Sequence, residues 1–502
     1  MQKTESGNPK SGRHGSPNRP PEGVCHSLRT PVGRRPYLAT RTPQARLLAL
    51  APLVLVAGVA FAEAKSWNPR DYGAKADGVA LDTKAIQAAV DACAQAGGGT
   101  VKLAGGLYLS GTVVLKSGVT LYVDNTAVLR GSSNIRDYLS MTPQVNCLYK
   151  ERFTKSLIYA ERQENIGLAG DGVIDGQGTL FPAKKGDDGG RPYIVRFSEC
   201  KKARVRGLMF VNSARWLSHY LACEDVEIQH VTIRSRIRDN RDGMDIDSCD
   251  GVVIRDCDIY SGDDSIVLKS TVAERPCRNV TVTGCRLSSQ LAALKLGTES
   301  QGGFENIRFS DCFLYDSADG LAIEEVDGGI CQGVCVSNMV MRNVRIPVFV
   351  RLGNRANPVP GTPTPGMGKM SDILISDIDA TGAINWGCSV TGIPGHPVEK
   401  VTLKNIRIRF AGGGQPPAPG SQVPEKEKDM PYGGMFGKLP AYGFYCRHVS
   451  GLKLHNIELS VEQEDARPAV IADDVVDLDV KDLKAQVKAG VEKLTRVPRF
   501  ER

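Results

Sequence analysis

The stretch Asn279-Val280-Thr281-Val282 is one copy of a short phrase that recurs along most of the chain. Each copy starts with a polar residue or glycine, continues with apolar residues at alternating positions, and ends in Asn, Asp or Gly. The first apolar positions fall about 26 to 28 residues apart over the middle of the chain, and further copies follow: Val226, Val252, Val280, Ile307, Val334, Ile373, Val401, Leu452 and Leu478. Short alternating strands at a constant period cannot bury their own apolar faces, so they predict a solenoid. Because the strands are rich in Val and Ile and the turns in Asn, Asp and Gly, we expect an all-β protein, a parallel β-helix.

A helical pattern precedes the first strands. In residues 83–96 four apolar side chains fall on one helical face: Ile86, Ala89, Val90 and Cys93. Asp82 stands at the N-cap position, and three glycines follow the last turn. A stack of strands has open ends that invite aggregation, so we expect this short helix to cap the N-terminal end of the solenoid.

Two intervals between copies of the phrase are longer than the rest and rich in Pro and Gly: residues 354–369 and 412–440. Insertions in solenoids leave the stack as loops, often on the side that binds a ligand. A surface loop without a role is the alternative for each of them.

Residues 1–64 differ in composition from the rest of the chain. Nine of the 63 Lys and Arg and three of the 56 Asp and Glu lie there, which leaves about +1 of the formal charge of +7 for the remainder. A short apolar core at residues 47–61 follows the arginines and precedes small residues around Ala62, which is typical of a secretory signal. Arg34-Arg35 also resembles a twin-arginine signal. We therefore expect an export leader over residues 1–64, a single β-helix domain over residues 65–502, and a secreted or periplasmic protein.

The same numbers limit the partners. A charge near +1 gives no electrostatic reason to expect a nucleic-acid partner. The apolar core of the leader is too short for a comfortable membrane span, and no later stretch qualifies. We expect no membrane association after leader removal and a monomeric protein.

The spacings of the fourteen cysteines predict no metal site, because none of them matches a zinc motif. Cys257, Cys285 and Cys312 recur at one position of the repeat, and Met339 takes that position next. This pattern predicts stacked interior side chains rather than disulfides. We expect neither a metal nor another cofactor.

Four aspartates lie on two segments about one repeat apart: Asn240-Arg241-Asp242-Gly243-Met244-Asp245 and Gly262-Asp263-Asp264. Adjacent rungs of a parallel stack are about 4.8 Å apart, so Asp242 and Asp263 should meet. Carboxylates so close together repel one another when all of them are ionised, so one should keep its proton near neutral pH. Hydrolysis of a glycosidic bond by inversion needs one acid for the leaving oxygen and one base for water, with a gap wide enough for that water. Solvated aspartate turns or a calcium site are the alternatives.

These motifs resemble those of the family 28 glycoside hydrolases, the polygalacturonase group of right-handed parallel β-helices. The resemblance rests on Asn240-x-Asp242-Gly243-x-Asp245, on Gly262-Asp263-Asp264 and on the Ile266-Val267-Leu268-Lys269-Ser270 that follows. The run from Asp71-Tyr72-Gly73-Ala74 to the glycines before Val101 is similar to the start of pectin-active β-helix enzymes. The likeness extends roughly from Trp67 to Leu483.

The resemblance implies an exported, inverting hydrolase of pectic, galacturonate-containing poly- or oligosaccharide. Its catalytic residues would be Asp263 as general acid, with Asp242 and Asp264 holding the attacking water. The same motifs would contribute substrate contacts from Asn240, Asp245 and Lys269.

The likeness is uneven on the next two coils. Ala292 stands where the family has His, and Ala322 and Glu324 stand where it has an Arg and Lys pair that grips a galacturonate carboxylate. Glu324 would repel that carboxylate, or it could pair with Lys295. Lys295 and Arg351 could restore positive charge. We therefore expect Lys295, Glu324 and Arg351 to contact the substrate in a modified subsite.

The sequence leaves several functions open. The favoured one is a polygalacturonase-like hydrolase with this modified subsite. A rhamnogalacturonan-type or exo-acting pectic glycosidase of the same family is the first alternative. A calcium-dependent pectate lyase and a non-catalytic glycan-binding β-helix are alternatives of another class, although a binding surface has no need for three carboxylates on adjoining rungs.

Overall fold

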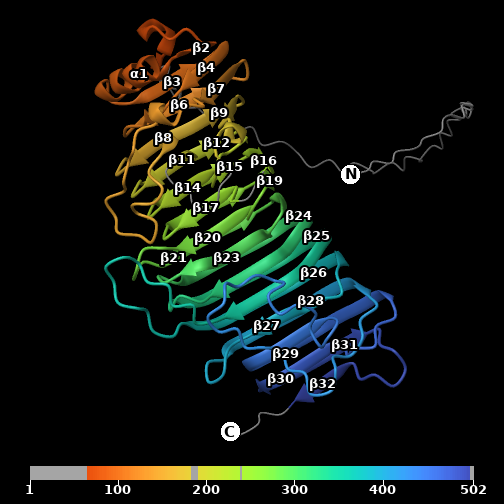
Figure 1. The fold of residues 1–502 in the computed structure, drawn as a ribbon. Coiled ribbons are helices and arrows are strands. Elements are labelled where there is room, and N and C mark those ends of the chain that lie inside the picture. Colours follow the sequence, from red (N-terminus) through yellow and green to blue (C-terminus); the bar gives the residue numbers. More distant parts are fainter. Residues whose placement is uncertain (1–64, 183–189, 238–239, 498–502) are drawn as a thin grey trace, which may run out of the picture. The chain divides into compact units, whose positions relative to one another are not determined.

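The structure, a computed structural model, describes residues 65–182, 190–237 and 240–497. Over these residues the chain forms a right-handed parallel β-helix, whose strands follow one another as rungs of a stack in Figure 1. The fold class expected from the sequence is thus confirmed. The expected export leader lies outside the described residues.

Three ladders of parallel strands build the stack, and the longest strands take part in more than one ladder. The first ladder, which carries the motif residues, consists of β5 (Val113–Val114), β8 (Ser156–Glu161), β11 (Tyr193–Ser198), β14 (Ser218–Leu221), β17 (Met244–Asp247), β20 (Ile266–Ser270), β23 (Ala292–Ser300), β24 (Phe304–Glu325), β25 (Ile330–Leu352), β27 (Cys388–Thr391), β29 (Phe444–Gln463), β30 (Val470–Val476) and β32 (Leu494–Val497).

The second ladder consists of β1 (Ser66–Trp67), β3 (Gly99–Leu103), β6 (Val119–Val123), β9 (Gly167–Gly170), β12 (Arg204–Arg206), β15 (Glu224–Gln229), β18 (Asp250–Arg255), β21 (Cys277–Thr283), β24, β25, β26 (Lys369–Ala383), β28 (Val398–Gly412), β29 and β31 (Asp479–Ala485). The third consists of β2 (Asp77–Leu81), β4 (Gly106–Ser110), β7 (Ala127–Gly131), β10 (Val173–Asp175), β13 (Met209–Val211), β16 (Thr232–Ser235), β19 (Asp258–Ser261), β22 (Arg286–Ser289), and then β24, β25, β26, β28 and β29.

The core lies inside the stack, where the apolar positions of the repeated phrase face one another. Val226, Val252, Val280, Ile307 and Val334 are paired in register from rung to rung. Each is at most 2% exposed. Val and Ile side chains of successive rungs therefore stack on one another. The constant period of the sequence in this way removes their apolar surface from water.

The polar residues of the phrase occupy turns that need a left-handed backbone. Asn279 and Asn306, on successive coils, have φ of 54° and 53°. Asn tolerates this region better than most residues. The Asn306 side-chain amide also donates to the Asn279 side-chain oxygen at 2.8 Å, so the turns are tied together along the stack.

Helix α1 (Thr83–Gln95) forms where the helical pattern predicts it, and Figure 1 shows it beside the first strands. Its role as a cap stays a prediction. Asp82 is the N-cap residue of this helix, as the sequence indicates, but its side chain makes no capping hydrogen bond. The Asp82 carboxylate instead accepts the N–H groups of Lys75 and Ala76, at 2.7 and 3.0 Å, because the preceding loop lies closer to it than the helix amides do. Three short 3₁₀ helices complete the described elements: η1 (Pro69–Tyr72), η2 (Ile135–Asp137) and η3 (Gly178–Leu180).

Both predicted insertions leave the stack as loops, between β25 and β26 and between β28 and β29. They contact each other, since the N–H of Asn354 in the first donates to the carbonyl of Glu427 in the second at 2.6 Å. The second also contacts the first ladder, as described below.

The cysteines that the repeat placed in the interior lie there. Cys257, Cys285 and Cys312 are at most 3% exposed and unpaired, and Cys312 is in register with Met339. A search of the described residues for a helix long and apolar enough to cross a membrane found none.

Replacement of Asn306 tests the role of the left-handed turns. Valine is strained at positive φ by about 1–2 kcal/mol, whereas glycine is not. We expect Asn306→Val to lower the free energy of unfolding more than Asn306→Gly does, measured by chemical denaturation. Both variants lose the side-chain hydrogen bond to Asn279, so equal losses would show that the backbone conformation contributes nothing.

Candidate active site

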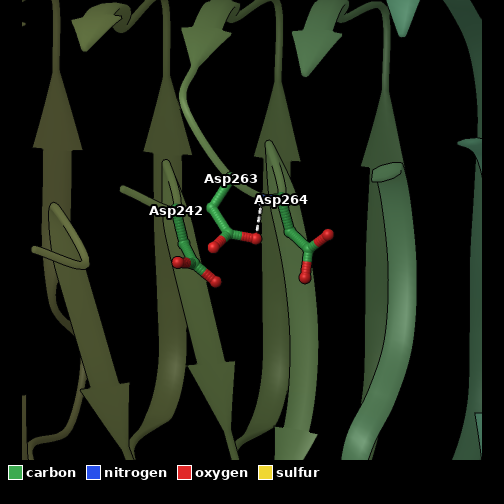
Figure 2. Close-up of side chains that lie close together, drawn as sticks. All are labelled: Asp242, Asp263 and Asp264. Carbon is green, nitrogen blue, oxygen red and sulfur yellow. Dashed lines mark hydrogen bonds between the residues drawn. The ribbon is translucent and has the colours of Figure 1, made fainter. Parts of the chain in front are cut away.

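Three aspartates of the two motifs meet on the outer side of the first ladder. Asp242 lies just before β17, and Asp263 and Asp264 lie just before β20 on the next coil. Figure 2 shows the three carboxylates close to one another, and one oxygen from each lies within 4.8 Å of the others. The juxtaposition that the spacing predicted is therefore present, but the oxygens are closer than the wide gap we expected between acid and base.

Backbone hydrogen bonds between the coils hold the aspartates in place. The N–H of Gly243 donates to the Asp264 carbonyl at 2.9 Å, which fixes the coil of Asp242 against that of Asp264. Alternation along a strand would send Asp263 and Asp264 to opposite faces. The chain avoids this by turning, because the N–H groups of Gly262 and Asp263 both donate to the Arg241 carbonyl at 3.2 Å.

Asp263 is the most exposed member of the group, although it is still half-buried. Its two oxygens accept the backbone N–H groups of Asn240 and Asp264, each at 3.0 Å. Burial, followed by the charge of Asp264, raises the pKa of Asp263 to about 6. Asn240 thus contributes a backbone donor to the group, whereas the sequence suggested a substrate contact.

Asp242 is almost fully buried, and its Oδ1 has no hydrogen-bond partner among the described residues. Burial, together with the charges of Asp245 and Asp263, raises its pKa well above the usual range. An unpartnered buried acceptor is costly, so this oxygen is a place where a bound water or hydroxyl group would be stabilising.

Asp264 differs from the other two because a cation lies beside it. One of its oxygens accepts the N–H of Ala292 at 3.0 Å, and the other lies 3.3 Å from the Lys295 ammonium. Asp264 is therefore the member of the group with a positive charge in direct contact.

Lys295 is shared between two carboxylates. Its ammonium lies 3.7 Å from Glu324, and the Thr298 hydroxyl donates to the same Glu324 oxygen at 2.9 Å. Glu324 is completely buried, and burial is the main reason why its pKa rises to about 7. Of the two roles that the sequence left open for Glu324, pairing with Lys295 is the one that the geometry shows.

Lys269 and Asp245 belong to a second buried ionic group. The Lys269 ammonium lies 3.0 Å from Glu299 and 3.7 Å from Asp245, and 4.6 Å from the centre of the Trp216 ring. Burial opposes ionisation of Glu299, but Lys269 and Arg355 outweigh it and lower the pKa of Glu299 to about 2. Burial raises the pKa of Asp245 well above its usual range. Lys269 and Asp245 are therefore buried and contact protein groups, whereas the sequence suggested substrate contacts.

The prediction that Arg351 contacts substrate is wrong for this arrangement. Arg351 is 1% exposed, and its guanidinium donates to the carbonyls of Gly392, Glu425 and Lys426 at 2.9, 2.6 and 3.2 Å. It anchors the second insertion to the first ladder, because buried guanidinium donors need acceptors.

Sequence reasoning missed two carboxylates of the site. Glu299 lies in the irregular part of β23 between Leu296 and Ser300, and Asp319 begins the part of β24 that pairs with β23. Asp319 accepts the N–H of Gly433, from the second insertion, at 2.9 Å, and burial raises its pKa to about 6. Continuing the register of the motif coils to residue 319 would have found Asp319, but no pattern in the sequence connects it with Gly433.

The three aspartates are also the described residues best placed to hold a metal ion, because hard oxygen ligands suit calcium. The ammonium of Lys295 stands 3.3 Å from one of these oxygens, where it would repel a divalent cation. The arrangement offers an acid with a raised pKa, a carboxylate beside a cation and an unpartnered acceptor. Those are the groups that hydrolysis of a glycosidic bond needs, so the fold and the site define a class of β-helical glycosidases.

Comparison with known proteins specifies the family. A family model described as glycosyl hydrolases family 28 matches residues 95–426. A probable polygalacturonase of Vitis vinifera is 28% identical over 366 residues, which are 68% of this chain and 74% of that protein. The chain therefore belongs to family 28 of the glycosyl hydrolases.

Solved structures agree on the fold. An exopolygalacturonase from Thermotoga maritima superposes with a TM-score of 0.60 at 22% identity, covering 69% of this chain and 87% of that one. A family 28 exopolygalacturonase from Yersinia enterocolitica gives 0.63 at 17% identity, covering 88% and 80%. At these identities the likeness concerns the β-helix alone.

Removal of the Lys269 charge tests its structural role. In Lys269→Met the aliphatic packing is largely kept, but Asp245 loses its cation inside the protein and Glu299 keeps only Arg355, and breaking a buried pair costs about 3–5 kcal/mol in comparable cases. We expect a clear fall in the thermal unfolding temperature. Lys201→Met is the matched control, because its pair with Glu224 is exposed and worth about 0–1 kcal/mol. Similar small effects in both variants would contradict the role assigned to Lys269.

Proposed function

We propose that the protein hydrolyses a pectic, galacturonate-containing polysaccharide or oligosaccharide with inversion at the anomeric carbon. Family membership supports the reaction class, and polygalacturonase relatives support the substrate class. The observation that carries the proposal is the chemical difference among three carboxylates that lie within 4.8 Å of one another.

Asp263 acts as the general acid. It is the most exposed of the three, so a glycosidic oxygen can reach it, and its pKa of about 6 keeps the proton available in mildly acidic solution. The two backbone N–H groups on its oxygens fix the direction of the carboxyl group.

Asp264 and Asp242 hold the attacking water. We assign the base to Asp264, which has the Lys295 ammonium 3.3 Å away, because burial favours the neutral form of Asp242. The unpartnered Oδ1 of Asp242 gives the water a second hydrogen-bond partner. Oxygens within 4.8 Å of one another can share one water, since each hydrogen bond spans about 2.7–2.8 Å.

The short distance bears directly on the stereochemistry. Inverting enzymes commonly separate the two carboxyl groups by about 6.5–9.5 Å, and retaining enzymes by about 5–5.5 Å. Retention would need one aspartate to attack the sugar itself. We propose inversion because two carboxylates besides the acid, Asp242 and Asp264, lie close enough together to hold one water between them.

Exo action is a second candidate that the loops favour. On one side of the aspartates, the Tyr149 hydroxyl donates to Glu299 at 2.8 Å, and the Phe153 ring lies 3.2 Å from the Arg215 guanidinium. On the other side, Gly433 of the second insertion contacts Asp319. A site with loops against both ends accepts the end of a chain more readily than its middle.

Export and a monomeric state complete the proposal. The leader pattern of residues 1–64 supports secretion or transfer to the periplasm, with a single β-helix domain over residues 65–502 as the mature protein. A polymeric substrate outside the cell is consistent with that location.

Substitution of the acid tests the assignment. Asp263→Asn keeps the size of the side chain but removes the proton donor. We therefore expect kcat/KM, measured from the reducing ends that are released, to fall by about 10²–10⁴-fold. Lys201→Met, distant in the sequence and exposed, is the activity control. Products with an unsaturated end, detected by their absorbance, would instead show a lyase, and no product from any pectic fraction would favour a glycan-binding protein.

The pH dependence tests the protonation state. The folded-state pKa of Asp263 is raised from 3.8 to about 6, so the acid form persists below about pH 6 and is lost above it. We expect kcat/KM to fall as the pH rises through about 6, measured on a pectic oligosaccharide over pH 4–8. A rate that stays constant up to pH 8 would exclude Asp263 as the proton donor.

A further inference from the structure

We propose that the sugar bound on the Asp319 side of the scissile bond carries no carboxylate, and that Glu324 imposes this selectivity. The inference rests on the proposed hydrolase function and adds to it the charge of one of the two sugars that flank the cleaved bond.

The cation next to the aspartates is already neutralised by the protein. Lys295 lies 3.3 Å from Asp264 and 3.7 Å from Glu324, and Glu324 is completely buried at the base of this pair. A uronate carboxylate that approached Lys295 would meet two negative groups around one positive group. Without Glu324, the same lysine would be a binding group for a carboxylate.

The other cations around this side are committed as well. Lys269 pairs with Glu299 at 3.0 Å, and Arg355 donates to Asp327 at 2.9 Å. Arg351 donates to three backbone carbonyls of the loops. Arg345 is exposed and stacks over Trp386 at 5.9 Å. It lies two coils beyond Lys295, about 10 Å further along the stack, and one coil beyond Asp319, whose negative charge it partly balances.

The acidic groups outnumber the basic ones here. The single ammonium of Lys295 lies among three carboxylates, those of Asp264, Asp319 and Glu324. The three carboxylates are at most 7% exposed, and Lys295 is 8% exposed. Charges interact more strongly in such a dry place than in water. A fourth carboxylate, brought by the substrate, would therefore be repelled.

A buried apolar cluster lies next to these acidic groups. Ala292 and Ala322 lie on two successive rungs. They pack with Ile346 and Phe349 of β25 and with Met435 of the second insertion. This cluster supports the part of the insertion that carries Tyr432, which is 52% exposed. Tyr432 directly precedes Gly433, whose N–H donates to Asp319, so this exposed residue comes next to the acidic group.

Leu291 is a second exposed residue next to Asp319. It is 44% exposed, and its carbonyl accepts the N–H of Asp319 at 2.9 Å. An exposed leucine and an exposed tyrosine next to Asp319 suit the C–H faces of a sugar. The ligand chemistry that fits is a neutral sugar, such as a 6-deoxyhexose, with the uronate on the other side of the bond.

Two substrates distinguish this selectivity from a general one for pectic chains. Oligosaccharides of homogalacturonan have a carboxylate on every sugar, whereas those of a rhamnogalacturonan backbone alternate uronates with neutral 6-deoxy sugars. We expect the wild-type protein at pH 7.5 to prefer the alternating substrate by at least about tenfold in kcat/KM. Its products should show the neutral sugar always on the same side of the cleaved bond.

The variant Glu324→Gln should reduce this preference about tenfold at pH 7.5, since removing one buried charge frees Lys295. At pH 5.5 the substitution should have little effect, because the pKa of Glu324 is about 7 and the wild-type side chain is then neutral too. The groups that face Glu324 are Lys295, Asp264, Asp319 and Thr298, and all of them are kept. A purely structural role would not make the effect depend on pH.

Glu325→Gln is the matched control, because Glu325 is equally buried on the same strand but accepts the N–H of Gly329 and touches no lysine. Its preference should equal that of the wild type. Wild-type cleavage of homogalacturonan as efficient as that of the alternating substrate, or an unchanged preference in Glu324→Gln, would overturn the inference alone. Cleavage of neither substrate would overturn the proposed function and the inference together.

Discussion

The hydrogen-bonded stacking of coils is the constraint on which the rest of this protein depends. Parallel rungs are about 4.8 Å apart, so a residue and its counterpart one coil later are always neighbours. The bond from the Gly243 N–H to the Asp264 carbonyl belongs to that stack, and together with the bonds from the N–H groups of Gly262 and Asp263 to the Arg241 carbonyl it fixes the two aspartate motifs against each other. The stack holds the three carboxylates close together, and burial followed by the neighbouring charges raises the pKa of Asp242 and of Asp263.

The surroundings decide which carboxylate does what. Asp263 is half-buried, and its pKa of about 6 means that it is protonated below that pH. Asp264 has the Lys295 ammonium beside it. The lysine is in turn balanced by Glu324 on a later coil. The proposed acid–base chemistry and the proposed rejection of a carboxylate therefore depend on the same short column of charged side chains, with Lys295 common to both.

Much of this could be predicted from the sequence, and the rest could not, for physical reasons. The period of Val226 to Val334 follows directly from burial, and the meeting of Asp242 with Asp263 follows from the period. Arg351 was predicted at the site because it is a cation on the right coil, but loop carbonyls that no periodicity describes capture its guanidinium. Asp319 was missed for the related reason that its partner, Gly433, comes from an insertion.

The configuration of the newly formed sugar end tests the central claim most directly. Proton NMR recorded while the protein cleaves a pectic oligosaccharide shows which anomer appears first, before mutarotation mixes the two. If the stacked aspartates act as acid, base and water holder, the first product has the inverted configuration. A first product with the retained configuration would mean that an aspartate attacks the sugar itself, and would contradict the account.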